Sequence, residues 1–195
     1  MKYLAAFAFA LTGCASGKHD VQVVGVQGGD IDLATADVVV SSITLTPCDD
    51  SENVEITLNS AVDLLGPPQP HAVKDQDWCR VELACEDTPE AGGLSLAGTL
   101  GSAELMGSLA CDGPALEGKF EALNGDLVLV FDLGLLLSDV ESDGVSVSFP
   151  YGSPQSESLT RDLPEALYFG TPDSAATKFG EDWPFSEDSF DSRGE

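Results

Sequence analysis

Two cysteines at the ends of one alternating segment most constrain how this chain folds. The segment Trp78–Cys85 alternates apolar with mostly polar residues, and Cys79 and Cys85 share the apolar positions with Val81 and Leu83. Such alternation predicts a half-buried strand with both cysteines on its core face. Six residues of strand separate the two Cα atoms by roughly 20 Å, whereas bridged Cα atoms lie within about 7 Å. These two cysteines therefore cannot bridge each other.

The partners must come from the other cysteines, Cys48 and Cys111, because Cys14 belongs to a separate N-terminal pattern. We favour the pairs Cys48–Cys79 and Cys85–Cys111, and the crossed pairing stays open as the second choice. A tetrahedral zinc site is the competing interpretation, but no C-x-x-C spacing supports it. Two structural disulfides predict folding in an oxidising compartment.

The remaining sequence consists of short apolar segments separated by turn residues, which predicts an antiparallel β-sandwich over residues 21–152. Ser60–Leu65 fits either a helical turn or a short strand. Leu127–Leu137 is apolar on both faces and is expected to be a central, doubly covered strand. The expected strands are Val21–Val26, Asp37–Leu45, Val54–Leu58, Trp78–Cys85, Leu94–Leu100, Ala103–Leu109, Leu116–Leu123, Leu127–Leu137 and 145–149.

Asn124-Gly125, between Leu116–Leu123 and Leu127–Leu137, is the strongest hairpin signal in the chain. Beyond residue 152 the pattern changes, and residues 153–195 carry scattered Pro, Ser, Gly and acidic residues, with one short helix expected at Leu163–Leu167. Such composition buries too little apolar surface to offset its ordering entropy. We therefore expect a mostly disordered acidic tail over residues 153–195.

The N-terminus resembles the signal and lipobox of bacterial lipoproteins. Met1-Lys2-Tyr3 precedes an apolar run, Leu4–Leu11, that is too short to cross a bilayer, and the exit reads Leu11-Thr12-Gly13-Cys14. The resemblance implies cleavage of a signal peptide at residues 1–13 and acylation of Cys14, followed by a lipidated tether at residues 14–20. Ala15 after the cysteine implies sorting to the outer membrane of a Gram-negative bacterium.

Charge restricts the partners of the mature chain. Removal of residues 1–13 takes away Lys2 and leaves 7 cations against 34 carboxylates, a net charge near −27. Nucleic acid and anionic lipid surfaces are therefore excluded as electrostatic partners. Solubility accounts for the acidity more simply than binding of divalent cations does.

Over roughly residues 21–140 the chain also resembles a family of uncharacterised bacterial envelope lipoproteins with a prealbumin-like or carbohydrate-binding-like β-sandwich. The four core cysteines, and the lack of a glycine-aromatic turn before the middle strand, depart from the family pattern. The resemblance implies a fold and an envelope location, and no activity. The matching segments are Val38–Leu45, Val62–Leu65, Trp78–Leu83, Leu116–Phe120 and Leu127–Asp132.

Candidate site residues are few. His19 falls in the expected tether, and His71 follows prolines in a loop expected to be exposed. Asp139, Glu141 and Asp143 stand at alternate positions before Gly144, as in the first half of a calcium loop, but Pro150 occupies the twelfth position in place of Glu. An acidic hairpin turn is the preferred interpretation, and Gly28–Asp32 is a weaker oxygen cluster of the same kind.

The sequence lacks a G-x-S-x-G motif, a P-loop and a G-x-G-x-x-G cradle. We therefore predict a non-enzymatic binding or structural module with no cofactor, anchored to the membrane through Cys14, with an envelope protein or a glycan as its partner. The first alternative is a calcium-dependent glycan-binding or carbohydrate-active domain, for example a carboxylate-based glycoside hydrolase. The second is an assembly factor that docks a partner through its acidic tail.

Overall fold

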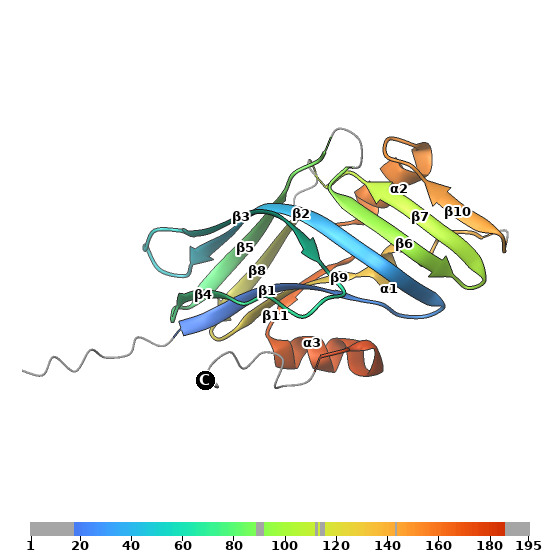
Figure 1. The fold of residues 1–195 in the computed structure, drawn as a ribbon. Helices are drawn as coiled ribbons and strands as arrows, with labels where there is room; N and C mark the ends of the chain where they lie inside the picture. The colour runs from blue at the N-terminus through green and yellow to red at the C-terminus, as the bar shows by residue number, and fades with distance from the viewer. Residues whose placement is uncertain (1–17, 89–91, 112, 114–115, 143, 186–195) are drawn as a thin grey trace, which may run out of the picture.

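The computed structural model describes residues 18–88, 92–111, 113, 116–142 and 144–185 of the chain. These residues form an all-β, sandwich-like fold of two sheets with a few short helices (Figure 1). The predicted fold class is therefore confirmed. Two disulfides, Cys48–Cys79 and Cys85–Cys111, staple the fold in the favoured pairing.

The smaller sheet has four strands in the order β11-β9-β1-β4. Its strands are β1 (Lys18–Val26), β4 (His71–Lys74), β9 (Leu127–Asp132) and β11 (Leu167–Gly170). β1 pairs with β9 in parallel, with Val21 opposite Leu127, while β4 and β11 lie antiparallel at the two edges. The parallel pair departs from the antiparallel pattern of the predicted sandwich, because the chain returns to this sheet through long crossovers.

The larger sheet follows the order β10-β7-β6-β2-β5-β8, and β3 pairs with β2. Its parallel pair joins β10 to β7. The strands are β2 (Ile31–Pro47), β3 (Val54–Asp63), β5 (Trp78–Cys85), β6 (Leu94–Leu100), β7 (Ala103–Leu109), β8 (Leu116–Leu123) and β10 (Ser146–Phe149).

The 17-residue strand β2 joins the two halves of the larger sheet. Its first half pairs with β6 and its second half with β5, so these two strands follow each other along β2 (Figure 1). Leu64 links the two sheets, because its N–H donates to Ala36 O at 2.8 Å and its carbonyl accepts from Gly25 N at 2.7 Å. The sequence fitted either a helical turn or a strand at Ser60–Leu65. In the structure this segment is strand up to Asp63 and then links the two sheets.

The main core lies between the sheets. Val21, Leu129 and Phe131 from the smaller sheet meet fully buried side chains such as Ile43 and Trp78 from the larger one. Trp78 and Cys79 depart from the predicted alternation: the pairing of β5 with β8 shifts register between Trp78 and Arg80, which leaves Trp78 fully buried and Cys79 half-buried. An irregularity of this kind changes the face that a residue occupies.

A second apolar layer covers the outer face of the smaller sheet. Val24 and Val26 of β1 and Val128 and Val130 of β9 pack there against Ala175 and the aromatic residues that follow it. All five residues of β9 from Leu127 to Phe131 are therefore buried, which confirms the doubly covered strand over this stretch. Beyond Asp132 the expected strand is replaced by the helix α1 (Leu133–Leu136), for which the Asp132 side chain is the N-cap.

The C-terminal segment corrects the prediction of a disordered tail. Residues 153–185 form α2 (Pro154–Asp162), β11, α3 (Pro172–Phe179) and the short 3₁₀ helix η1 (Gly180–Asp182). β11 pairs with β9, and α3 lies beneath the smaller sheet in Figure 1. The physical reason is the outer apolar face of β1 and β9, which only this segment covers among the described residues; residues 186–195 lie outside them.

The hairpin predicted at Asn124-Gly125 was also wrong. β8 pairs with β5 in the larger sheet, and β9 pairs with β1 and β11 in the smaller one, so the turn carries the chain between sheets. Asn124 donates from Nδ2 to Oδ1 of Asp77 at 2.8 Å, and Gly125 has a φ of 114°. Gly125 thus supplies the positive φ of a turn, but Asn124 does not share it as a two-residue hairpin turn requires, and the flanking strands pair with other strands.

Candidate functional site

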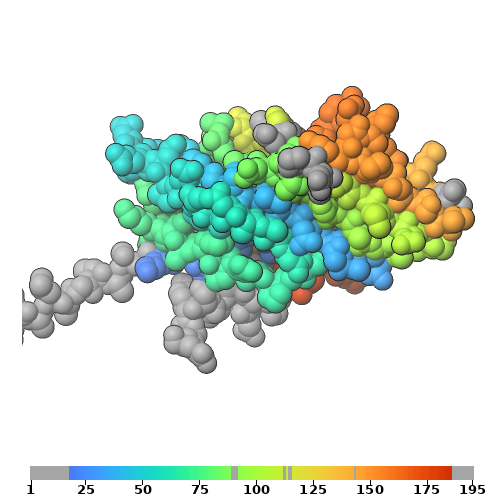
Figure 2. All heavy atoms as spheres, turned by 45° about the horizontal axis from the view of Figure 1, so that its top comes forward, coloured from blue at the N-terminus to red at the C-terminus, as the bar shows by residue number. Residues whose placement is uncertain are grey.

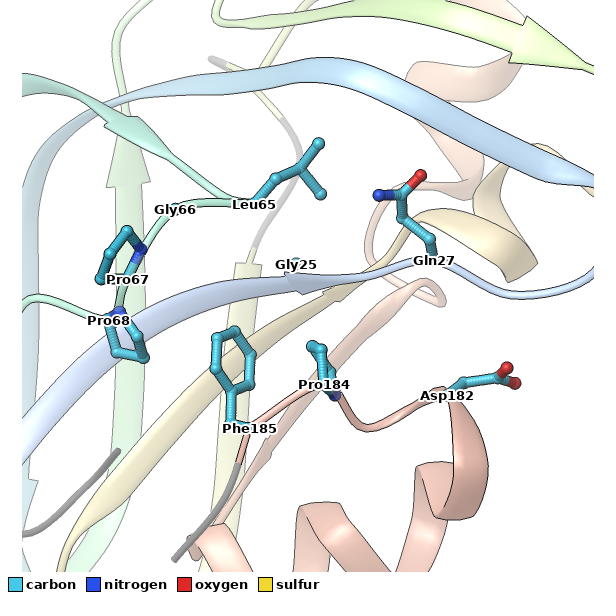
Figure 3. A pocket seen from close by; sticks show the side chains of 9 residues that line it. All are labelled: Gly25, Gln27, Leu65, Gly66, Pro67, Pro68, Asp182, Pro184 and Phe185. Carbon is cyan, nitrogen blue, oxygen red and sulfur yellow. The ribbon is translucent and has the colours of Figure 1, made fainter. Parts of the chain in front are cut away.

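One cavity lies beside the C-terminal end of β1 and has a volume of about 510 Å³. Figure 3 shows Pro67, Pro68 and Leu65 along one side, with Pro184 and Phe185 facing them. The cavity is thus built between the loop after β3 and the end of the C-terminal segment. The complete lining is Gly25, Gln27, Leu65, Gly66, Pro67, Pro68, Asp182, Pro184 and Phe185.

A tight turn after β3 sets the first wall. Oδ1 of Asp63 accepts from the backbone N–H of Leu65 at 3.0 Å and of Gly66 at 3.1 Å, as aspartate commonly does at turns. A Cβ on Gly66 would lie only 2.8 Å from the Asp63 carboxylate, so glycine permits this close approach. Pro67 and Pro68 then fix the backbone, and their rings line the cavity.

Gly25 and Gln27 of the β1 end supply the second wall. A Cβ on Gly25 would lie 2.9 Å from the Cβ of Leu64, so only glycine allows the loop after β3 to pack this closely. Oε1 of Gln27 accepts from the Leu33 N–H at 2.5 Å, which fixes the amide and leaves its NH₂ group as a donor on the cavity side (Figure 3).

Asp182 separates this cavity from a second one of about 510 Å³. In Figure 3 its carboxylate points away from the proline rings, and a Cβ on Gly28 would lie 3.1 Å from its Oδ2. Asp30 and Asp132 line the second cavity, but Asp132 is already used, since its Oδ1 accepts from the Leu135 N–H at 2.8 Å.

The two cavities differ in the groups that line them. The first offers proline, leucine and phenylalanine surfaces and the NH₂ donor of Gln27, which suits an apolar group that carries a hydrogen-bond acceptor. Sequence reasoning did not identify this cavity. The available signals were the rigid Pro67-Pro68 pair and the aromatic stretch that ends at Phe185, but nothing in the sequence showed that they meet.

The four core cysteines lie where the sequence predicted pairing. Cα atoms of Cys48 and Cys79 are 4.8 Å apart, and those of Cys85 and Cys111 are 5.4 Å apart. The second bridge holds the loop between β5 and β6, where the backbone N–H of Cys111 also donates to Oδ1 of Asp87 at 2.7 Å. Both bridges are structural staples on β5 and lie outside the lining of the first cavity.

The predicted calcium residues are only partly described. Asp139 and Glu141 are exposed in the segment between α1 and β10, and Asp143 lies outside the described residues. The preferred hairpin interpretation was wrong, because this segment joins a helix to a strand that runs parallel to β7. Among the residues that the structure describes, no three His, Cys, Asp or Glu side chains form a group that could hold a metal ion.

The two histidines lie in strands and not in a tether or loop, which corrects both predictions. His19 belongs to β1, which begins at Lys18, and its Nε2 lies 3.0 Å from Oδ1 of Asp75, while its Nδ1 lies 3.6 Å from Oδ1 of Asp126. His71 is half-buried at the start of β4. β1 therefore includes the three residues before Val21, where the first strand was expected to begin.

The shifted titrating groups are all at the surface. On β5 and β8, hydrogen bonds from Lys119 and then Arg80 lower the pKa of the Glu117 carboxyl, and the bond to Glu117 raises the pKa of Arg80. Hydrogen bonds from Ser51 lower the pKa of Asp49. Each of these shifts favours the charged form, which is the opposite of what a carboxylic general acid needs at neutral pH.

Comparisons with known protein families, with curated proteins and with solved structures give no match. The family resemblance seen in the sequence therefore stays a prediction. None of the helices in the described part of the chain is long and apolar enough to span a membrane.

Proposed function

We propose that this protein is an exported lipoprotein, acylated at Cys14 and sorted to the outer membrane, which serves there as a non-enzymatic binding module. The observation that carries the proposal is the position of Cys14, which completes the lipobox only four residues before β1 begins at Lys18. The two disulfides support export, because such bonds persist in oxidising compartments.

The short spacing defines how the domain would sit on the membrane. Four residues span at most about 14 Å when extended. The anchor end, which we define as the start of β1 with the loops at residues 75–77 and 124–126, would therefore face the lipid. Gly25 lies seven residues further along β1, roughly 23 Å from Lys18 at strand geometry. The proline-lined cavity would consequently be clear of the headgroups and open to a partner.

A binding role is supported by the construction of the domain. Two disulfides and a doubly covered strand make a rigid scaffold, and the cavity at its side presents apolar rings with one amide. The alternative function was docking of a partner through a free acidic tail. Residues 171–185 are not a free tail, because this segment packs on the smaller sheet, so they do not support that alternative. No observation on the described residues favours the calcium-dependent alternative.

The lipid anchor can be tested by intact mass spectrometry of the protein isolated from bacterial envelopes. We expect a mature chain that lacks residues 1–13, carries acyl groups on Cys14, and incorporates an alkyne-labelled fatty acid. Cys14→Ser should abolish the label and retain residues 1–13, because the thiol is the acylated nucleophile. A wild-type chain that is cut elsewhere and carries no lipid would refute the proposal.

Two further variants act as controls. Ser16→Ala changes a neighbouring small residue and should leave both label and mass shift unchanged. Ala15→Asp should keep the lipid but move the protein from outer-membrane to inner-membrane fractions on a density gradient. Retention of Ala15→Asp in the outer membrane would remove the sorting part of the proposal while leaving the anchor intact.

A further inference from the structure

The strand β3 is an edge strand of the larger sheet. Among the described residues it pairs with β2 alone, so its other edge carries backbone N–H and C=O groups with no neighbouring strand. In Figure 2 the cyan and teal atoms around β3 lie uncovered at the surface. An edge of this kind is a template for an added strand.

The apolar core also ends at β3. Ile56 and Val54 stand opposite Ile43 and Leu45 of β2, which are fully buried, yet both β3 residues are only half-buried. Leu58 is half-buried in the same row. A further strand beside β3 would complete the backbone pairing and cover this apolar row at the same time.

The usable edge is the first half of β3. The pairing with β2 shifts register between Val40 and Ser42, and Asn59 opposite this point has a φ of 46°. A bulge twists an edge and interrupts pairing. The stretch Val54–Leu58 is therefore the part on which an added strand would lie flat.

Charge identifies the occupant. Residues 49–58 contain four carboxylates and no lysine or arginine, and the four side chains are exposed: Asp49, Asp50, Glu52 and Glu55. A second copy of this chain would bring the same four negative charges to the same edge. Like charges on paired strands are destabilising and opposite charges are stabilising, which favours a cationic strand.

We propose that β3 is a strand-addition site for an extended, lysine- or arginine-rich segment of another envelope protein, which pairs with Val54–Leu58. The inference rests on the proposed binding function and names its partner class. Main-chain hydrogen bonds would provide the affinity, the half-buried aliphatic row would select small apolar residues at alternate positions, and the acidic side chains would select lysine or arginine between them.

The test uses the exported protein with its anchor in detergent and a dye-labelled Lys-Val-Lys-Val-Lys peptide as the probe. We expect saturable binding by fluorescence anisotropy at about 0.15 M salt, and hydrogen-exchange protection of amides within residues 54–58. Glu52→Lys with Glu55→Lys should weaken binding about tenfold and should permit binding of a Glu-Val-Glu-Val-Glu peptide instead. Both residues are exposed, so the fold should be retained.

Two controls separate strand addition from general charge attraction. Glu157→Lys with Glu165→Lys changes the net charge equally at exposed positions elsewhere and should leave binding unchanged. A probe methylated at the amide nitrogens that face β3 should not bind, because it cannot form the main-chain hydrogen bonds. Equal weakening by both double variants, binding of the methylated probe, or protection outside β3 would each overturn the inference.

The result is independent of the anchor experiment. Lipid on Cys14 together with no binding of the lysine probe would leave the envelope lipoprotein in place and remove only the strand-addition site. Binding of the probe by a protein that carries no lipid would support the strand-addition site and refute the lipid anchor.

Discussion

At the scale of single residues, cations of this chain shift the pKa of identified neighbours. Arg80 lies between Glu82 and Glu117 on the outer side of the larger sheet, and Nζ of Lys119 lies 2.7 Å from Oε1 of Glu117. With eight lysine and arginine residues against 34 acidic ones, most carboxylates have no such partner available. Glu117 is therefore the carboxylate whose ionisation depends most clearly on named neighbours.

Lys119→Gln should raise the pKa of Glu117 toward its ordinary value of 4.5, because the largest cause of the lowered pKa is the hydrogen bond from Lys119. The measurement is an NMR titration of the Glu117 side-chain carboxyl carbon. Lys74→Gln, which removes an exposed lysine from β4 of the other sheet, should leave that titration unchanged. An equal shift in both variants would show that net charge, and not the local bond, lowers this pKa.

The sign of the effect on stability follows from linkage. The pKa of Glu117 is lower in the folded chain than its ordinary value of 4.5, so its contribution to stability is present above pH 4.5. The contribution is lost as the pH falls through the folded-state pKa. Unfolding midpoints of wild type and Lys119→Gln should therefore differ above pH 4.5 and converge in stronger acid.

At the scale of elements, the sequence predicted best where local geometry alone decides. The strand at Trp78–Cys85 was sufficient to exclude a bridge between its own cysteines, and the two-sided apolar run identified β9 as doubly covered. The Asn124-Gly125 turn shows the limit of such reasoning. A chain turn does form there, with a positive φ at Gly125, but pairing is decided by which strands the rest of the chain brings alongside.

The C-terminal segment was misjudged because its average composition hides two helix starts. Ser153-Pro154 and Thr171-Pro172 each place a capping side chain before a proline at the first helical position. Those side chains accept from Ser156 N and Ser174 N, respectively. A strand that is buried on both faces, such as β9, needs a segment that packs on its outer face, and residues 171–185 are that segment. The cavity depends on Pro184 and Phe185 of this segment, so it could not be predicted while the segment was expected to be disordered.

Ala175→Glu should destabilise the protein by about 3 kcal/mol, because it places a carboxylate between α3 and the four valines of the smaller sheet. Urea unfolding measures the loss. Trp183, which stacks on Phe179, should show a red-shifted emission if α3 detaches, while the buried Trp78 keeps its own. Thr177→Glu, at an exposed position on the same helix, should cost little. A loss for Ala175→Glu as small as that for Thr177→Glu would mean that α3 contributes no packing.

At the scale of the whole molecule, stability is a balance between a rigid apolar centre and a repelling surface. The full chain carries a formal net charge of −26. Self-repulsion of this size opposes the compact state. The two disulfides and the two apolar layers hold together a domain whose surface charge acts against it.

Salt should therefore stabilise this protein. The Debye length falls from about 30 Å at 0.01 M to about 3 Å at 1 M, which screens most of the repulsion. We expect NaCl over this range to raise the unfolding free energy by about 1 kcal/mol and Tm by about 3 °C. Scanning calorimetry measures the change. A Tm that falls with NaCl would contradict self-repulsion as the dominant charge effect.

Two comparisons identify where the salt acts. The triple variant Glu52→Gln, Glu55→Gln and Asp63→Asn removes charge at β3 and should gain less from NaCl, because part of the repulsion is already absent. CaCl₂ and MgCl₂ at equal ionic strength should raise Tm equally if screening is the cause. CaCl₂ could instead raise Tm more than MgCl₂ does, and the difference could be lost in the double variant Asp139→Asn with Glu141→Gln. That result would establish the calcium site suggested by the sequence pattern. These surface carboxylates would then be calcium ligands and not only solvated charges.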